Sequence, residues 1–464
     1  MTAAVGTGAA RQRRGKLARR ETALGRSRAP AADQGLSHRA QLIAATAIVL
    51  ATVLLLGLNL AYMHGKAVLD LSIYRCYAHG FWHGVAAAPR TEWHACTTLW
   101  HGSTPARFHA LPAEYPAPAL LIFSLPLLTP WWSYATAFEL WMALPLLLAT
   151  AALAWRGRLE AAAALPIYCL LAGWLFAFER YDLLPGLCVM ASLLCLQDRR
   201  YRWATVALAA GTVLKGFPIL LFPLVLLAAR REEQGRWRTD LVALFAAVCA
   251  ACLLPALLLD PGGTVGPLHY ELARPLHIES LPGGLLWFLS SAGDHPHVRL
   301  PGTTSVQFTY NSLNIWGGPQ AAWGGTFLLA GLAGIAVAYR RAWRGEDTRG
   351  RSVVVLLLLL LAAGKVFSPQ YLLWLLPAVA VVDGLRGRWL LLCLLTAVII
   401  DYYFNSSLIA LPWTAGFTGS ILLRNALLLG FALLYLLTRG DTTARHWPTK
   451  PLWRYIWYDY LKAP

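Results

Sequence analysis

Residues 64–84 read HGKAVLDLSIYRCYAHGFWHG, and this polar and aromatic stretch follows the first long hydrophobic run of the chain. It opens a segment without a membrane-spanning pattern that ends at EYPAPALLIFSLPLL, residues 114–128. Most of the remaining chain consists of one helix-length hydrophobic run after another. A long polar loop in such a chain needs a reason, and we interpret Asp70 as a catalytic base held just outside the bilayer. The alternative is a solvated interfacial acid.

Composition defines the class of protein. Of the 464 residues, 57% are hydrophobic and only 14% are charged, and the mean hydropathy is +0.50. A soluble protein of this size needs far more polar surface. The apolar runs have helix length rather than the alternation of barrel strands. We therefore predict an all-α polytopic membrane protein, a bundle of about 12 transmembrane helices whose two external loops form an outward-facing cavity.

The positions of Lys and Arg predict the topology. We place spans at residues 41–62, 133–155, 161–178, 183–197, 203–214, 218–229, 240–258, 320–339, 352–364, 369–382, 389–404 and 419–437. With the N-terminus inside, 30 of the 40 Lys and Arg residues are cytoplasmic, whereas acidic residues divide almost evenly. This bias is the positive-inside signature. The net charge of +17 therefore reflects topology and contact with membrane lipids, and we expect no nucleic acid partner.

Three regions follow from this assignment. Residues 1–40 are rich in Arg, Ala and Gly, so we expect a disordered basic cytoplasmic tail. Residues 41–437 hold the membrane domain, and residues 438–464 form a second basic cytoplasmic tail. The expected location is the plasma membrane, with several passes and both termini in the cytoplasm.

Two pairs of hydrophobic runs are interrupted in a similar way. The runs at 203–214 and 218–229 each provide about 18 Å of helix against a hydrocarbon core of about 30 Å, and KGFP separates them. The later pair repeats this arrangement around KVFSP. Lys215 and Lys365 would each lie at the outer apex of a helical hairpin. Irregular backbone at this depth indicates a cavity, although a snorkelling Lys and a kinking Pro would also explain each break.

The cysteines and histidines favour structural roles over metal binding. Cys76 and Cys96 lie twenty residues apart in the first outer loop, where a disulfide is possible. His295 and His297 flank a Pro in a loop, and the histidines show no metal-binding spacing with carboxylates. We expect no metal ion and no cofactor.

The sequence leaves the roles of other charged residues open. Glu114 precedes Tyr-Pro and would cap or brace the loop, whereas Glu139 lies inside an apolar run and needs a partner. Arg274 and Glu279 in RPLHIES would form a structural ion pair or face a ligand. The chain has no Walker, GxGxxG or GxSxG motif, so nucleotide-driven transport and serine hydrolysis have no support.

Four motifs in order resemble a known family. DLSIYRCYAHGFWHG with EYPAPALLIFSLPLL, then VLKGFPILLFPLVLL, RPLHIESLP and KVFSPQYLLWLLP are similar to segments of the polyprenol-phosphate-mannose-dependent α-mannosyltransferases. These belong to glycosyltransferase family 87, membrane enzymes of the GT-C superfamily and DUF2029 type. The resemblance extends over about residues 41–437. It implies a membrane glycosyltransferase, specifically a hexosyltransferase, that acts in cell envelope biosynthesis.

The resemblance also implies roles for individual residues. Asp70 occupies the place of the family's general base, and Lys215, Arg274 and Lys365 would hold the lipid phosphate. The complete set of expected substrate-binding residues is Lys215, Arg274, Lys365, Glu279, His277, Gln370, Tyr371 and Tyr115. One departure is that Gln370 and Tyr371 stand where relatives often have a His-rich segment, so either the sugar-contacting group or the sugar differs.

The predicted activity is inverting transfer of a sugar, mannose by resemblance, from a polyprenyl-phosphate donor to an acceptor hydroxyl at the outer face. A monophosphate leaving group needs cations but no metal, and one carboxylate suffices to take the acceptor proton. The acceptor is a glycolipid, polysaccharide or protein. The alternatives are the same fold with another lipid-linked sugar, such as a pentose, and a lipid-linked-sugar flippase, which inverted repeats would support.

Overall fold

A computed structural model describes residues 37–63, 69–85, 96, 109–173, 177–291, 305–346, 350–407 and 410–438. The chain divides into two compact units, residues 1–44 and 45–464, and the second contains every feature below apart from the first turns of helix α2. The expected tails, except residues 37–40 and Thr438, lie outside the described residues, as do His295 and His297.

Helices dominate the described residues. The longer ones are α2 (His38–Met63), α6 (Tyr134–Trp155), α11 (Thr239–Leu259), α14 (Gln320–Arg344), α17 (Gly387–Asn405) and α18 (Ala415–Leu437). The shorter ones are α3 (Leu69–His83), α5 (Ala119–Ser124), α7 (Leu159–Gly173), α8 (Leu183–Gln197), α9 (Tyr201–Lys215), α10 (Phe222–Glu232), α12 (Pro261–Ala273), α13 (Leu281–Ser291), α15 (Arg351–Ala363) and α16 (Leu372–Asp383). Short 3₁₀ turns η3 (Leu125–Leu128), η4 (Phe217–Leu221), η5 (Pro369–Tyr371) and η6 (Leu411–Trp413) connect some of them.

Half of the predicted membrane spans correspond to helices that are long enough to cross a membrane. Within the described residues, six helices are long and apolar enough to cross a membrane, namely the six longer ones above. The other six predicted spans correspond to α7, α8, α9, α10, α15 and α16, which have between 11 and 15 residues. At 1.5 Å per residue the longest of these reaches only about 22 Å. Hydrophobic runs correctly located the helices. A hydrophobic run can also form a short helix that is buried among other helices, so it does not by itself indicate a membrane span.

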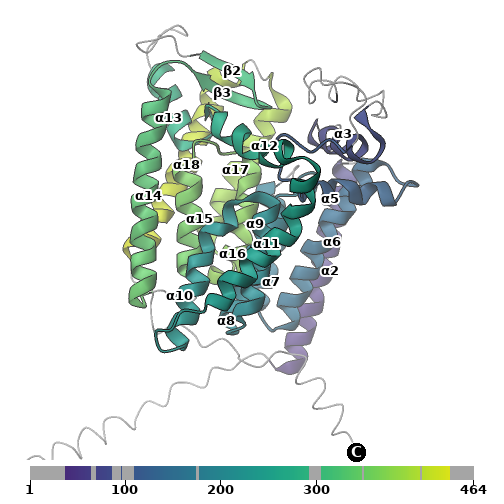
Figure 1. Ribbon diagram of the computed structural model, residues 1–464, viewed down its shortest axis with the longest axis vertical. Coiled ribbons are helices and arrows are strands. Elements are labelled where there is room, and N and C mark those ends of the chain that lie inside the picture. The colour runs from purple at the N-terminus through teal and green to yellow at the C-terminus, as the bar shows by residue number, and fades with distance from the viewer. Residues whose placement is uncertain are drawn as a thin grey trace, which may run out of the picture. The chain divides into compact units, whose positions relative to one another are not determined.

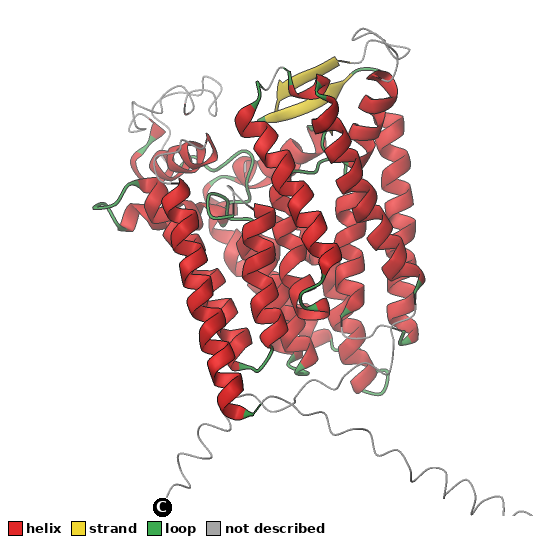
Figure 2. Cartoon of the chain, turned by 180° about the vertical axis from the view of Figure 1, so that it is seen from behind, coloured by secondary structure: helices red, strands yellow, loops and turns green. Residues whose placement is uncertain are grey.

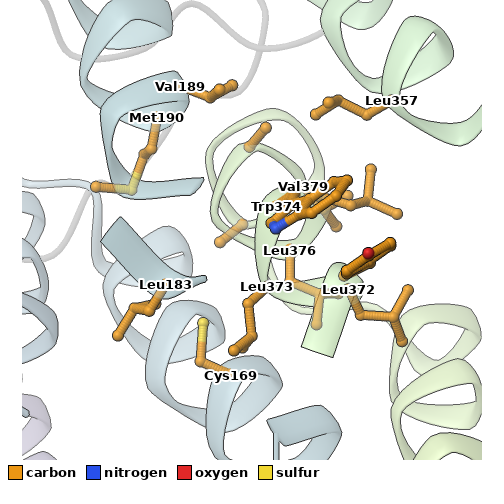
Figure 3. Packing of buried hydrophobic residues seen from close by; sticks show 14 of the residues in the cluster. Cys169, Leu183, Val189, Met190, Leu357, Leu372, Leu373, Trp374, Leu376 and Val379 are labelled. Carbon is orange, nitrogen blue, oxygen red and sulfur yellow. The ribbon is translucent and has the colours of Figure 1, made fainter. Parts of the chain in front are cut away.

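Helix α16 forms the centre of the core. Every residue from Leu372 to Val381 is buried, as expected for a helix that is hydrophobic on all sides. Figure 3 shows its side chains between those of α7, α8 and α15. The approach of α8 is close because Gly186 has no side chain: a Cβ there would lie 2.0 Å from the Leu373 carbonyl oxygen. The core thus fixes α16, and with it the turn that precedes it.

A small sheet accompanies the helices, and the fold remains that of an all-α membrane protein. Strands β1 (Leu276–His277), β2 (Ser305–Thr309) and β3 (Ser312–Trp316) form an antiparallel sheet in the order β1-β3-β2. Leu276 pairs with Ile315, and both side chains enter a second hydrophobic cluster with α13, α17 and α18. The sheet lies at the same end of the molecule as α3 and α12 (Figures 1 and 2). Folded elements therefore occupy much of what the sequence suggested to be loops.

Both expected breaks are present at this end. Helix α9 ends at Lys215, Gly216 adopts φ +58°, and η4 follows with Pro218 near its start. Helix α15 ends at Ala363, an extended segment contains Lys365, and η5 begins at Pro369. Each proline lacks the backbone N–H that would continue a helix. The two breaks bring both lysines to the cavity described next.

Candidate active site

A cavity of about 580 Å³ lies at the end that carries the sheet. Its walls come from α3, the segment before α5, the α7–α8 turn, both helix breaks, α11, α12 and the β2–β3 turn. The expected base Asp70 lines it together with most of the residues expected to bind substrate: Tyr115, Lys215, Arg274, His277, Lys365, Gln370 and Tyr371. Residues separated by up to 301 positions therefore meet in one space, which is large enough for a sugar and its phosphate.

Asp70 lies in the first turn of α3 and forms an ion pair with Arg180 of the α7–α8 turn. Both side chains are largely buried, at 14% and 18% exposure. Burial raises the pKa of Asp70, although Arg180 acts in the opposite direction. A carboxylate with a raised pKa is a stronger proton acceptor. The arginine contacts Oδ2 and so orients the carboxylate within the cavity.

Lys215 has a carboxylate partner that the sequence analysis missed. Its Nζ donates to Asp182 Oδ1 at 2.7 Å, and the Trp374 indole N–H donates to the same oxygen at 2.7 Å. The ammonium group also lies 5.0 Å from the Tyr181 ring centre and 5.3 Å from that of Tyr371. Aromatic faces attract a cation, so Lys215 is held rigidly and part of its charge is neutralised before any substrate arrives.

Arg274 and Lys365 form a second cationic group. The Lys365 Nζ donates to the carbonyl oxygens of Leu272 and Arg274, both at 2.8 Å. Arg274 contacts Glu271 at 3.3 Å and the Ser312 hydroxyl at 3.2 Å, but its buried Nε–H finds no acceptor among the described residues. Burial lowers the pKa of Lys365. A cation held by carbonyls beside an unsatisfied guanidinium N–H is suited to an anion.

His277 presents a neutral ring to the cavity. Its Nδ1 contacts the Phe367 carbonyl oxygen, which can only accept, so Nδ1 carries the proton and Nε2 is an acceptor. Burial first, and Arg274 second, lower the pKa of His277 to about 3. Its backbone N–H also donates to the Lys365 carbonyl oxygen at 2.9 Å. Strand β1 is thereby fastened to the second helix break.

One side of the cavity is apolar. Its leucines are Leu253 from α11, Leu268 and Leu272 from α12, and Leu360 and Leu361 from α15. Leu268 and Leu272 are 62% and 68% exposed. Exposed leucines next to buried charges form a surface that can accept a hydrocarbon chain together with a polar head.

Glu114 is a further carboxyl group in the cavity. It accepts a hydrogen bond at 2.9 Å from the side-chain amide of Asn311 in the β2–β3 turn. Burial, with a contribution from Asp70, raises the pKa of Glu114 to about 7, while Arg274 opposes the shift. Glu114 therefore links the segment before α5 to the β2–β3 turn, and it also lines the cavity.

This pKa predicts a pH dependence of stability. The pKa of Glu114 in the folded protein lies above its ordinary value of 4.5, so the folded state favours the protonated form. The contribution of Glu114 to the free energy of unfolding is therefore complete below about pH 4.5 and is lost as the pH rises through about 7. Glu114→Gln should remove this part of the pH dependence. Thermal unfolding midpoints at about pH 5 and about pH 8 test this, with exposed Glu233→Gln as control. An unchanged pH slope in Glu114→Gln would contradict the assignment.

Glu279 is not among the residues that line the cavity. It is 1% exposed and is paired with Arg424 of α18, which donates to its Oε2 at 3.0 Å and to its carbonyl oxygen at 2.7 Å. Tyr403 donates to Oε1 at 2.7 Å. Arg274, the partner suggested by proximity in sequence, instead contacts Glu271. Glu279 therefore holds the segment between α12 and α13 onto α17 and α18.

A disulfide joins Cys76 of α3 to Cys96, with 5.4 Å between the Cα atoms. This separation lies within the normal range for bridged cysteines. Cys76 is six residues from Asp70 on the same helix. The bridge therefore fixes the helix that carries the candidate base.

A comparison with protein families agrees with these features. The model of glycosyltransferase family 87 matches residues 114–369, more than half of the 464-residue chain. The chain belongs to glycosyltransferase family 87. No curated protein and no solved structure gives a significant match. The protein is thus a membrane glycosyltransferase.

The matched region of this family 87 enzyme includes Glu114, Arg180, Lys215, Arg274 and Lys365 but begins after Asp70. It is also shorter than the resemblance at residues 41–437. The roles of Asp70, Gln370 and Tyr371 therefore depend on the geometry of the cavity.

Sequence reasoning overlooked several residues of this enzyme. Arg180 and Asp182 belong to FERYDLL, where three charged residues interrupt two apolar runs on the expected outer side, and this was a usable signal. Arg424 likewise stands alone in SILLRNALLL. Glu139 is buried in α6 and does not line the cavity. Within the described residues no cluster of three or more His, Cys, Asp or Glu side chains is placed to hold a metal ion.

Proposed function

We propose that the enzyme transfers mannose from a polyprenyl-phosphate donor to an acceptor hydroxyl at the outer face of the plasma membrane, with inversion at the anomeric carbon. The observation that carries the proposal is that one cavity combines a buried carboxylate, two cationic groups and an exposed leucine wall. A nucleotide sugar has no need of such a wall. A lipid-linked sugar needs all three parts.

The donor fits in one orientation. Its phosphate lies between Lys365 and Arg274, where the unsatisfied Arg274 Nε–H can donate to it. Its polyprenyl chain lies along Leu268 and Leu272 towards lipid. The sugar then points towards Asp70, and His277 Nε2 can accept a hydrogen bond from a sugar hydroxyl. No metal is needed to neutralise a single phosphate between these cations.

The reaction balances with these groups. Asp70 takes the proton of the acceptor hydroxyl as its oxygen bonds to the anomeric carbon. The bond between that carbon and the phosphate oxygen breaks, and polyprenyl phosphate leaves with the electron pair. Attack from the face opposite the leaving group inverts the configuration. Arg180 keeps the Asp70 carboxylate aimed while the proton moves.

The donor assignment predicts the effect of removing Lys365. Lys365→Ala should raise the KM for polyprenyl-phosphate mannose about 10- to 100-fold, because hydrogen bonds to charged groups contribute about 1.5–3 kcal/mol. Purified enzyme with radiolabelled donor and total membrane lipid provides the assay. Arg236→Ala, an exposed cation before α11, is the control. Equal activity with a nucleotide sugar in the absence of the lipid donor would refute the proposal.

Lys215 needs a paired substitution. Lys215→Ala alone leaves Asp182, which is 1% exposed, as a buried and uncompensated charge, so the fold would suffer. Lys215→Ala combined with Asp182→Asn removes both charges. We expect this double variant to fold and to bind the donor more weakly. If the donor KM of this double variant is unchanged, Lys215 does not bind the phosphate, and Arg274 and Lys365 alone hold it.

A further inference from the structure

In Figure 1, α10 and the C-terminal part of α14 lie at the end of the molecule opposite the sheet. A second cavity lies between these two helices. We call it the basal groove. It has a volume of about 390 Å³ and is lined by Pro223, Leu226, Leu227, Trp237, Tyr339, Arg340 and Trp343. All but Arg340 present carbon-rich side chains. This end is the Lys- and Arg-rich side of the sequence, so the groove faces the cytoplasmic leaflet in the topology we predict.

Two half-exposed tryptophans mark the membrane boundary at the groove. Trp237 is 50% exposed and Trp343 is 53% exposed. The Arg230 guanidinium carbon lies 4.8 Å from the Trp237 ring centre and 4.4 Å from that of Trp343. The Arg230 guanidinium therefore interacts with both indole rings at this end of the groove. Tryptophans in such positions lie at the level of lipid headgroups.

Arg340 lines the groove, and neither Arg340 nor the nearby Arg344 has an acidic partner among the described residues. Arg340 and Arg344 are both exposed and lie one helical turn apart on α14, so they share a face. Their neighbour Arg341 differs, because it pairs with Glu346 at 3.1 Å and contacts the Thr438 carbonyl oxygen. Two uncompensated cations therefore stand beside an apolar hollow.

The nearby carboxylates of α10 are already engaged elsewhere. Glu232 pairs with Arg199 at 2.8 Å, and the adjacent Glu233 pairs with Arg238 at 3.1 Å. Neither neutralises the arginines of α14 in the structure. The charge at the groove thus calls for an anion from outside the described residues.

We propose that the basal groove binds one anionic phospholipid of the cytoplasmic leaflet. Its acyl chain lies against Leu226 and Leu227, and its headgroup phosphate pairs with Arg340 and Arg344. Any lipid could fill an apolar hollow in a bilayer, but a neutral zwitterionic headgroup leaves the two arginine charges unbalanced. Charge complementarity therefore selects the anionic class. The site is separate from the catalytic cavity and goes beyond the proposed reaction.

The test measures lipid binding directly, without an activity assay. The purified enzyme in nonionic detergent is titrated with phosphatidylglycerol or with phosphatidylcholine of the same chains, and bound lipid is counted by native mass spectrometry. We expect wild type to prefer phosphatidylglycerol by roughly 10- to 30-fold, given two basic residues near the phosphate. Arg340→Gln with Arg344→Gln should abolish this preference. Arg200→Gln with Arg236→Gln, two exposed arginines outside the groove, should preserve it.

A substitution in the wall of the basal groove distinguishes the effect of its shape on lipid binding from the effect of its charge. Trp343→Ala should weaken binding of both lipids to a similar extent, because it removes part of the wall but no charge. Equal affinity of wild type for the two lipids would overturn the proposal, and so would an unchanged preference in the double glutamine variant. If Trp343→Ala affects neither lipid, the phospholipid binds elsewhere and the groove assignment is wrong.

Discussion

Asp70→Asn should lower the turnover number by about 10²–10⁴-fold, the usual cost of losing a general base. Asparagine keeps the size of the side chain and can still accept the hydrogen bond from Arg180. It cannot take a proton from the acceptor hydroxyl. Donor affinity should stay equal or rise slightly, because removing a negative charge from the cavity favours the phosphate. Steady-state kinetics with separate determination of kcat and donor KM measures both effects.

Two comparisons make the Asp70 result decisive. Asp401→Asn changes an exposed acid at the end of α17 and should have almost no effect. Asp70→Asn with Arg180→Gln removes the whole ion pair. If Asp70 served only to balance Arg180, this double variant would recover turnover, whereas a general base predicts that it stays inactive. Wild-type turnover in Asp70→Asn would remove Asp70 from the mechanism.

Arg424→Gln should destabilise the protein by about 3–5 kcal/mol, because it leaves the buried Glu279 carboxylate without its charge partner. Arg424 is 0% exposed and holds both the side chain and the backbone of Glu279. Its guanidinium also lies 4.1 Å from the Phe367 ring centre, beside the second helix break. Thermal unfolding in detergent provides the measurement.

The matched variants distinguish charge from packing. Glu279→Gln with Arg424→Gln leaves no isolated charge and should recover much of the lost stability. Arg156→Gln breaks a pair whose side chains are 33% and 30% exposed, and it should cost less than about 1 kcal/mol. Equal losses for Arg424→Gln and Arg156→Gln would show that the Glu279 pair contributes no more than a surface contact.

Local patterns predicted the parts of the site that depend on local chemistry. Gly216 and Pro218 follow Lys215, and Pro369 precedes Gln370. Each proline lies between two short apolar runs, so both breaks could be placed from sequence. The polar segment around Asp70 stood out because hydrophobic runs flank it. The two helix breaks and the segment around Asp70 contain most of the predicted residues that line the cavity.

Long-range pairing could not be predicted in this way. Glu279 meets Arg424 across 145 residues, and nothing near RPLHIES indicates a partner in α18. Arg274 was the nearest cation in sequence, but β1 begins between the two residues and separates them. Only six of the predicted spans are long enough to be candidates, because an apolar sequence does not distinguish contact with lipid from contact with other helices. Helix α16 shows this, since protein surrounds it on all sides.

The separation of Asp70 from the Lys365 and Arg274 group has a consequence for product release. In the proposed reaction one unit of negative charge moves across the cavity, from the carboxylate to the departing phosphate. The cations that stabilise this departure then face a phosphate monoester, which carries more negative charge than the donor. They should retain polyprenyl phosphate longer than they hold the intact donor. We therefore expect the spent lipid carrier to inhibit the enzyme, and its escape into the bilayer to limit the rate of each cycle.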